Sequence, residues 1–167
     1  MDAETAAQII EASDAPEGAQ YLTFVLCEEH YGVDILRVQE IRGWETVTRI
    51  PNTPAYVKGV INLRGAIVPI LDLRQRFGLP VDAYTKETVV IVLRSRGTHG
   101  ERHVGVVVDA VSDVLTVRDQ MVSRTPDFGA HVPTESIRGL VTEGEDMVML
   151  LDVDALVHEA EPVEAPR

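Results

Sequence analysis

Hydrophobic residues fall in short runs separated by polar turns, a pattern typical of β-strands. Residues 21–26 and 31–35 flank the charged turn 28–30 and predict a first β-hairpin. Residues 88–93 and 103–108 predict a second hairpin, joined by a longer turn that contains glycine. The pattern therefore indicates a mainly β protein.

Helix signals are sparse and local. Thr53 and Pro54 resemble an N-cap followed by proline at the first helical position, with Gly59 as a stop one turn later. Asp72 is a candidate N-cap for a second short helix that runs through Arg76. We expect both helices to be short.

The chain contains an internal repeat. Four segments of its first half align in the same order with four of its second half, and the offset changes only from 73 to 80 residues. The aligned pairs are 32–41 with 105–114, 47–51 with 122–126, 57–60 with 137–140, and 70–73 with 150–153. A repeat of this kind predicts two related structural units.

Each unit, at roughly 65 residues, is near the smallest size that buries a useful core. Two such units would curl into small β-barrels that hide their sheet edges and pack around a shared core with pseudo-twofold symmetry. We expect a first barrel over 21–84 and a second over 85–157, with terminal segments able to pack on the other barrel. Residues 1–20 and 158–167 are expected to be acidic, flexible tails.

The chain is acidic, with 27 Asp and Glu against 15 Lys and Arg in 167 residues and a formal charge of −12. This charge opposes binding to nucleic acid or to an anionic membrane surface. No apolar run approaches the length of a membrane span, and the acidic N-terminus does not resemble a secretory signal. A cytoplasmic protein without membrane insertion is therefore expected.

No set of residues converges on a catalytic or metal site. Cys27 ends an apolar strand and has no cation beside it that would activate a thiol. His99 and His103 lie in a turn without a third ligand. Asp72 and Asp152 occupy matching repeat positions, which suits two helix caps better than a catalytic pair. We expect no enzyme activity, no cofactor and no metal.

Two turns carry side chains that suggest contact surfaces. The turn 62–65 contains Leu63 and Arg64, whereas the matching turn 142–145 is polar. Leu63 can fold back onto the barrel while Arg64 pairs with a carboxylate such as Glu40, or Arg64 can contact a partner; the two roles are compatible. Phe128 lies in a turn-forming stretch and is either tucked under the loop or exposed as an interface anchor.

The sequence resembles the CheW-type chemotaxis coupling proteins. The resemblance covers essentially all of residues 21–157, and its most specific segments are 31–43, 50–65, 68–74, 89–93, 105–115 and 126–128. It implies two SH3-like barrels of about five strands each. It also implies an adaptor that couples the cytoplasmic tips of chemoreceptors to the regulatory domain of the CheA histidine kinase in signalling arrays.

The resemblance also implies contact residues. Receptor contact in the family lies in the groove between the barrels, and the matching positions are Val38, Glu40, Arg64 and Val90. Contacts with the kinase, or between CheW copies in rings, correspond to Met121, Ser123 and Phe128.

Two features depart from the family pattern: the hairpin 94–102 is longer than usual, and Ser123 stands where a basic residue is expected. Two alternatives stay open, namely an adaptor of a non-flagellar chemosensory pathway and a small hydrolase or metal protein.

Overall fold

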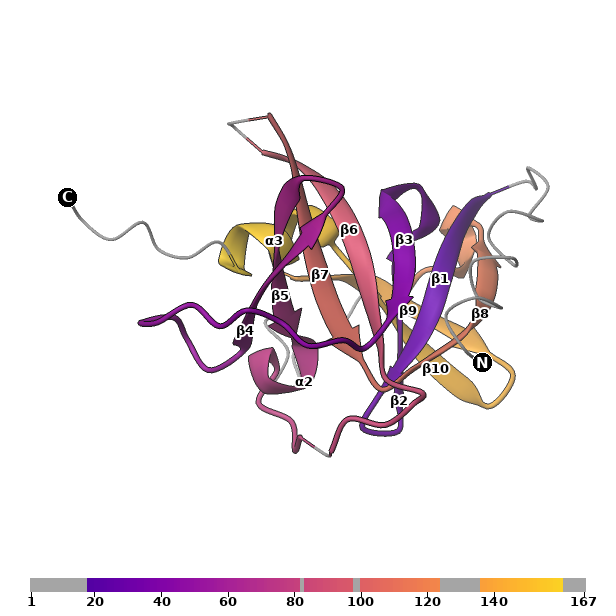
Figure 1. The fold of residues 1–167 in the computed structure, drawn as a ribbon. Coiled ribbons are helices and arrows are strands. Elements are labelled where there is room, and N and C mark those ends of the chain that lie inside the picture. Colours follow the sequence, from indigo (N-terminus) through magenta and orange to yellow (C-terminus); the bar gives the residue numbers. More distant parts are fainter. Residues whose placement is uncertain (1–17, 82, 98–99, 124–135, 161–167) are drawn as a thin grey trace.

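The computed structural model of this chain is mostly β and describes residues 18–81, 83–97, 100–123 and 136–160 (Figure 1). Its strands are β1 (Ala19–Leu26), β2 (Glu29–Asp34), β3 (Val38–Gly43), β4 (Val57–Leu63), β5 (Ala66–Asp72), β6 (Val89–Gly97), β7 (Gly100–Val108), β8 (Ala110–Val117), β9 (Ile137–Glu143) and β10 (Asp146–Leu151). The helical elements are the 3₁₀ turns η1 (Ile35–Arg37) and η2 (Asp119–Met121) and the helices α2 (Leu73–Arg76) and α3 (Val153–Ala160). Both predicted hairpins are confirmed, as β1–β2 and β6–β7.

The strands form two five-stranded sheets, each belonging to one SH3-like barrel. Sheet A has the order β8-β1-β2-β10-β9, and sheet B has the order β3-β6-β7-β5-β4. The chain crosses from sheet A to sheet B at η1, and it returns at Asp109 between β7 and β8.

The barrels consequently do not follow the expected boundaries 21–84 and 85–157. Sheet A joins the first hairpin to the last three strands, while sheet B is formed by the chain from β3 to β7. The exchange arises because η1 directs β3 away from β2, and β2 then pairs in parallel with β10. Terminal packing on the other barrel, which the sequence allowed, is the arrangement found. β1 and α3 also extend into the segments 1–20 and 158–167 that were expected to be tails.

The internal repeat relates one sheet to the other. The repeat offset carries β1 and β2 onto β6 and β7, and it carries β3, β4 and β5 onto β8, β9 and β10. When each strand of sheet A is replaced by its repeat counterpart, the order β8-β1-β2-β10-β9 becomes β3-β6-β7-β5-β4, which is the order of sheet B. The parallel pairs match at single residues, because Leu150 lies opposite Gly32 as Ile70 lies opposite Gly105. The pseudo-twofold prediction is confirmed.

A shared core joins the two sheets. Its largest cluster contains side chains from both sheets and both helices, including Phe24 and Tyr31 of sheet A, which stack at 5.9 Å between ring centroids. β6 is buried on both faces: Ile91 and Leu93 point into the shared core, whereas Val92 points into the interior of sheet B. A strand buried on both faces needs the continuous apolar run that the sequence has there.

The two predicted helices have different outcomes. The Asp72 helix is confirmed, since the Asp72 side chain accepts a hydrogen bond from the Arg74 amide at 3.0 Å and caps α2. The prediction of a helix after Thr53 is wrong, because the structure has no helix between β3 and β4, a stretch that is described throughout. The Thr53 hydroxyl donates to the Ile50 carbonyl, and the chain turns and enters β4. Gly59 lies inside β4 at φ 147°, where a Cβ would collide with the backbone of Thr48.

Candidate protein-interaction surface

Glu40 is positioned by an irregularity in β3. The register shifts between Val38 and Glu40, so that Val38 lies opposite Leu93 and Glu40 lies opposite Val92. One extra residue of β3 is accommodated at this shift. Val38 packs against the shared core, whereas Glu40 lies opposite Val92, whose side chain is in the interior of the sheet B barrel. Glu40 therefore stands at the edge of sheet B with most of its side chain covered.

Arg64 occupies a strained position in the turn between β4 and β5. Arg64 and Gly65 both have positive φ, 51° and 90°, as in the type I′ turns that favour glycine or asparagine. A residue with a Cβ in this region is disfavoured by about 1–2 kcal/mol. The Asn62 side chain stabilises the turn, because its Oδ1 accepts a hydrogen bond from the Gly65 amide at 2.8 Å. A side-chain role is the simplest reason for an arginine here.

Glu40 and Arg64 form an ion pair between the two edges of sheet B. Arg64 Nη1 donates to Glu40 Oε1 at 2.9 Å, which confirms the expected pairing. β3 and β4 are the outermost strands of sheet B. The ion pair therefore joins β3, at one edge of the sheet, to the turn that follows β4, at the opposite edge. The Arg64 side chain remains 73% exposed, and a large part of the guanidinium can contact a partner. Leu63 is buried in the sheet B interior, as expected.

The pair continues into a short chain of charges along β3. Arg42 lies 3.3 Å from Glu40 and 3.3 Å from Glu45. Burial opposes the charged form of Arg42, but hydrogen bonds and attraction from Glu45 and Glu40 outweigh it and raise the pKa of Arg42. The row Glu45–Arg42–Glu40–Arg64 thus runs from the end of β3 to the turn after β4 and orients Arg64.

The equivalent place in sheet A has no such pair. The repeat places Asp113 at the position of Glu40 and Gly144, with φ 60°, at the position of Arg64. Glycine there meets the demand of the turn without strain. The arginine is therefore a feature of one barrel only, which favours a specific role for it.

The four expected receptor-contact residues are only partly brought together. Val38, Glu40 and Arg64 lie on or against β3, and Val38 is half-buried. Val90 is 2% exposed and lies in the interior of sheet B. Val90 has no surface to offer a partner, because alternate residues of the doubly buried β6 point into the barrel.

The residues expected to contact the kinase or another copy of the chain lie on a different part of the molecule. Met121 ends η2 and is 39% exposed. Ser123 is exposed and exchanges backbone hydrogen bonds with Leu140 of β9, both at 2.8 Å. Phe128 lies outside the described residues.

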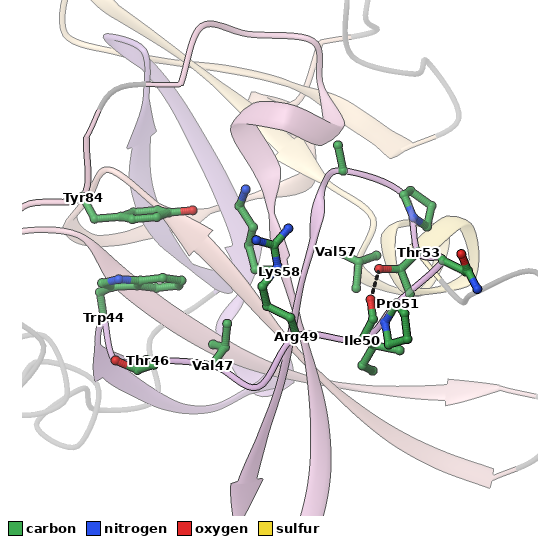
Figure 2. Close-up of a pocket in the computed structure, with 13 residues that line it drawn as sticks. Trp44, Thr46, Val47, Arg49, Ile50, Pro51, Thr53, Val57, Lys58 and Tyr84 are labelled. Atoms are coloured by element: carbon green, nitrogen blue, oxygen red, sulfur yellow. Dashed lines mark hydrogen bonds between the residues drawn. The ribbon is translucent and has the colours of Figure 1, made fainter.

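A cationic hollow, about 710 Å³ in volume, adjoins the end of β3 (Figure 2). The rings of Trp44 and Tyr84 stack at 4.1 Å between centroids and form one wall. The turn 50–54 forms the opposite wall, and Arg49 and Lys58 stand between the two. None of the thirteen lining residues is acidic.

Tyr84 connects this hollow to a buried charge cluster. Its hydroxyl donates to Asp72 Oδ2 at 3.0 Å, and the Arg74 guanidinium lies 5.1 Å from its ring centroid. Burial, followed by the charge and hydrogen bond of Asp72, raises the pKa of Tyr84 to about 12. Arg74 also donates to Asp109, between β7 and β8, at 2.9 Å.

Sequence reasoning missed the hollow and the charge row. Trp44 is the single tryptophan of the chain and follows a predicted strand, which was an available signal. Tyr84 meets it only because β3 and β6 pair, and residue spacing does not show that contact. Arg42 lies two residues from Glu40 on the same face of β3, so the alternation of a strand was an available signal for the charge row.

Metal-ligating side chains do not gather anywhere in the described ranges. His103 is half-buried in β7, and His99 lies outside these ranges. Among the described helices, none combines the length and apolar character required to cross a bilayer.

The chain is similar to known chemotaxis proteins. A family model described as "CheW-like domain" matches residues 20–161. The "Chemotaxis protein CheW" of Klebsiella aerogenes is 49% identical over 144 residues, which is 86% of this chain and 84% of that protein. The protein of the same name from Bacillus subtilis is 32% identical over 141 residues, covering 84% and 87%. Among solved structures, the scaffolding protein TtCheW from Thermoanaerobacter tengcongensis superposes with a TM-score of 0.78 at 29% identity, covering 89% and 94%.

Proposed function

We infer the function from the premise that this chain belongs to the CheW-like domain family. The family and the likeness to a scaffolding protein support a chemotaxis adaptor, which acts by holding other proteins together. We propose more specifically that the chain couples the cytoplasmic tips of chemoreceptors to the regulatory domain of the CheA kinase, and that it catalyses no reaction itself.

The observation that carries the receptor contact is the Glu40–Arg64 pair. Arg64 is held by Glu40 at 2.9 Å and is still largely exposed, so little freedom is lost when a partner binds it. Half-buried Val38, on the same strand as Glu40, supplies apolar surface. An amphipathic helix from a receptor tip fits this combination: its apolar stripe would lie along β3, and a carboxylate would meet Arg64.

The kinase contact is proposed for a separate surface. Met121 and Ser123 follow β8 of sheet A, whereas Arg64 follows β4 of sheet B. Contact surfaces on different sheets would let one chain bind two partners at once. Individually weak contacts then gain strength through effective concentration in an array. The contact at Phe128 stays a prediction.

The proposal is tested by co-sedimentation of this protein with receptor signalling-tip fragments, with and without kinase. We expect Arg64→Asp to weaken receptor-dependent pelleting about tenfold or more, because a carboxylate would face both Glu40 and the acidic group of the partner. Assembly of the ternary complex should fall in parallel.

Two further variants separate contact from folding. Arg96→Asp reverses an exposed arginine on β6 and should leave pelleting unchanged. The combined change Glu40→Arg with Arg64→Glu restores an ion pair across the edges of sheet B and should restore stability but not receptor binding. A folded Arg64→Asp variant that pellets like the unmodified protein would refute the receptor contact.

A further inference from the structure

We propose that the cationic hollow binds a small organic phosphate, a class that nucleoside diphosphates represent. The hollow is lined by neither Arg64 nor Met121 nor Ser123, the residues to which the receptor and kinase contacts are assigned. Binding of a small phosphate requires this chain alone. The inference therefore goes beyond the proposed function, and either one can fail without the other.

The hollow gathers positive charge without a counter-charge. The chain carries a formal charge of −12, yet Arg49 and Lys58 line the hollow and no acidic residue does. Neither cation makes an ion pair with another described residue. A phosphate group carries about two negative charges and three acceptor oxygens, so one group can meet both cations. A single carboxylate carries half that charge, and the site therefore favours a phosphate.

The backbone fixes the place of both cations. Thr48 and Val60 exchange backbone hydrogen bonds of 3.0 and 2.8 Å, which attach the segment before the turn 50–54 to β4. Gly59 permits this approach, because a Cβ at that position would collide with the backbone of Thr48. Arg49 follows Thr48, and Lys58 belongs to β4, so both side chains enter the same hollow (Figure 2).

The aromatic wall is fixed as well. The Tyr84 hydroxyl donates to the fully buried Asp72 at 3.0 Å, and Trp44 stacks on the Tyr84 ring. A wall that is already ordered loses little freedom when a ligand binds against it. Its ring surface beside the two cations suits a ligand that carries an organic group next to its phosphate. The volume of the hollow, about 710 Å³, lies within the range of about 300–1,000 Å³ that is usual for small-molecule sites.

The affinity should be modest. The net charge of the chain repels any anion, and Arg49 is exposed to solvent, which weakens its attraction for the phosphate. We expect a dissociation constant on the order of 0.1–1 mM for a nucleoside diphosphate.

Titration of the full chain with adenosine diphosphate, in the absence of kinase and receptor, tests the site. Calorimetry should give a saturable heat, and the emission of Trp44, the single tryptophan, should change with the same midpoint. Inorganic pyrophosphate should bind several-fold more weakly, because it has no organic group to contact the aromatic wall. Adenosine, which lacks the phosphates, should not saturate the site at millimolar concentration.

Two double variants assign the binding to the hollow. Arg49→Glu with Lys58→Glu should weaken binding of adenosine diphosphate about tenfold or more, and Arg49→Gln with Lys58→Gln should do so without adding negative charge. The matched control, Arg96→Glu with Arg138→Glu, alters two exposed arginines outside the hollow and should bind like the unmodified chain. Circular dichroism and unfolding midpoints establish that each variant is folded.

Three results would overturn the proposal. The first is the absence of saturable binding by the unmodified chain, and the second is equal binding by the folded double variants of Arg49 and Lys58. The third is a competing ligand that removes the preference for an organic phosphate. Pyrophosphate that binds as tightly as adenosine diphosphate would show a site for inorganic anions only, and a tetraglutamate peptide that binds as tightly would assign the hollow to an acidic protein segment.

Discussion

At the scale of single residues, the buried carboxylate of Asp72 shows how a local role extends into tertiary structure. Asp72 has no exposed surface and accepts four hydrogen bonds: from the Arg74 amide, from Arg74 Nε and Nη2, and from the Tyr84 hydroxyl. A buried charge is tolerated only when it is paired and hydrogen-bonded in this way. The cap was predictable from residue type, but the Tyr84 contact was not, because folding brings it from twelve residues away.

Tyr84→Phe should therefore destabilise the protein in a pH-dependent manner. The pKa of Tyr84 in the fold, about 12, lies above the ordinary value of 10 for a tyrosine, so the protonated phenol stabilises the fold fully below pH 10. That contribution is lost as pH rises from 10 to about 12. We expect the variant to be less stable by about 1–3 kcal/mol at pH 8 and the difference from the unmodified protein to narrow toward pH 12.

Urea unfolding of both proteins at a series of pH values measures this difference. Tyr56→Phe is the control, because the Tyr56 hydroxyl makes no hydrogen bond to another described residue. A Tyr84→Phe difference that stayed constant across the alkaline range would show that the hydroxyl does not couple to Asp72.

At the scale of elements, each crossover between the sheets is tied to a helix by an ion pair. At the second crossover, Asp109 pairs with Arg74 of α2 at 2.9 Å and also accepts the Cys27 amide of the β1–β2 turn at 2.8 Å. At the first crossover, Arg37 of η1 pairs with Asp154 of α3 through two bonds of 3.0 and 2.9 Å. The repeat aligns Arg74 with Asp154, so the charges are reversed between the two ties.

The two ties should differ in their contribution to stability. Arg74 is 1% exposed, and Arg74→Met would leave Asp72 buried without its cation, so we expect a loss of about 3–5 kcal/mol. Arg37 and Asp154 are 32% and 44% exposed, and Arg37→Ala should cost about 1 kcal/mol or less, falling further at high salt. Denaturant unfolding at low and high salt checks both values. Equal losses for the two variants would contradict the difference in burial on which the expectation rests.

At the scale of the whole molecule, the exchange of strands makes the two barrels interdependent. Sheet A contains two strands from the first repeat and three from the second. Sheet B contains three strands from the first repeat and two from the second. Each repeat alone would leave strands without the partners that they have in the fold. The repeat unit in the sequence is therefore not the folding unit.

Fragments cut between the repeats should accordingly fold only together. We expect residues 1–84 and 85–167, prepared separately, to lack cooperative unfolding, and their mixture to recover the circular dichroism and Trp44 emission of the intact chain. The expected change is complete rather than partial, because both sheets lose strands when the halves are separated. A cooperative unfolding transition in either fragment alone would contradict this interdependence.

Local pattern was sufficient for much of this protein. Alternating and continuous apolar runs predicted both hairpins, and the repeat predicted two related units. The contrast between the turns 62–65 and 142–145 singled out Arg64, for which pairing with a carboxylate such as Glu40 was one of two compatible roles. These features depend on neighbouring residues or on repeated order, both of which are explicit along the chain.

Only the tertiary structure decided which strands share a sheet and which side chains meet across it. Val90 is buried because β6 is covered on both faces, and the hollow exists because β3 and β6 bring Trp44 to Tyr84. The parallel pairs that exchange the strands join residues more than thirty positions apart, and no local preference specifies such a contact. Apolar and polar patterning selects the elements, whereas burial of the shared core selects their partners.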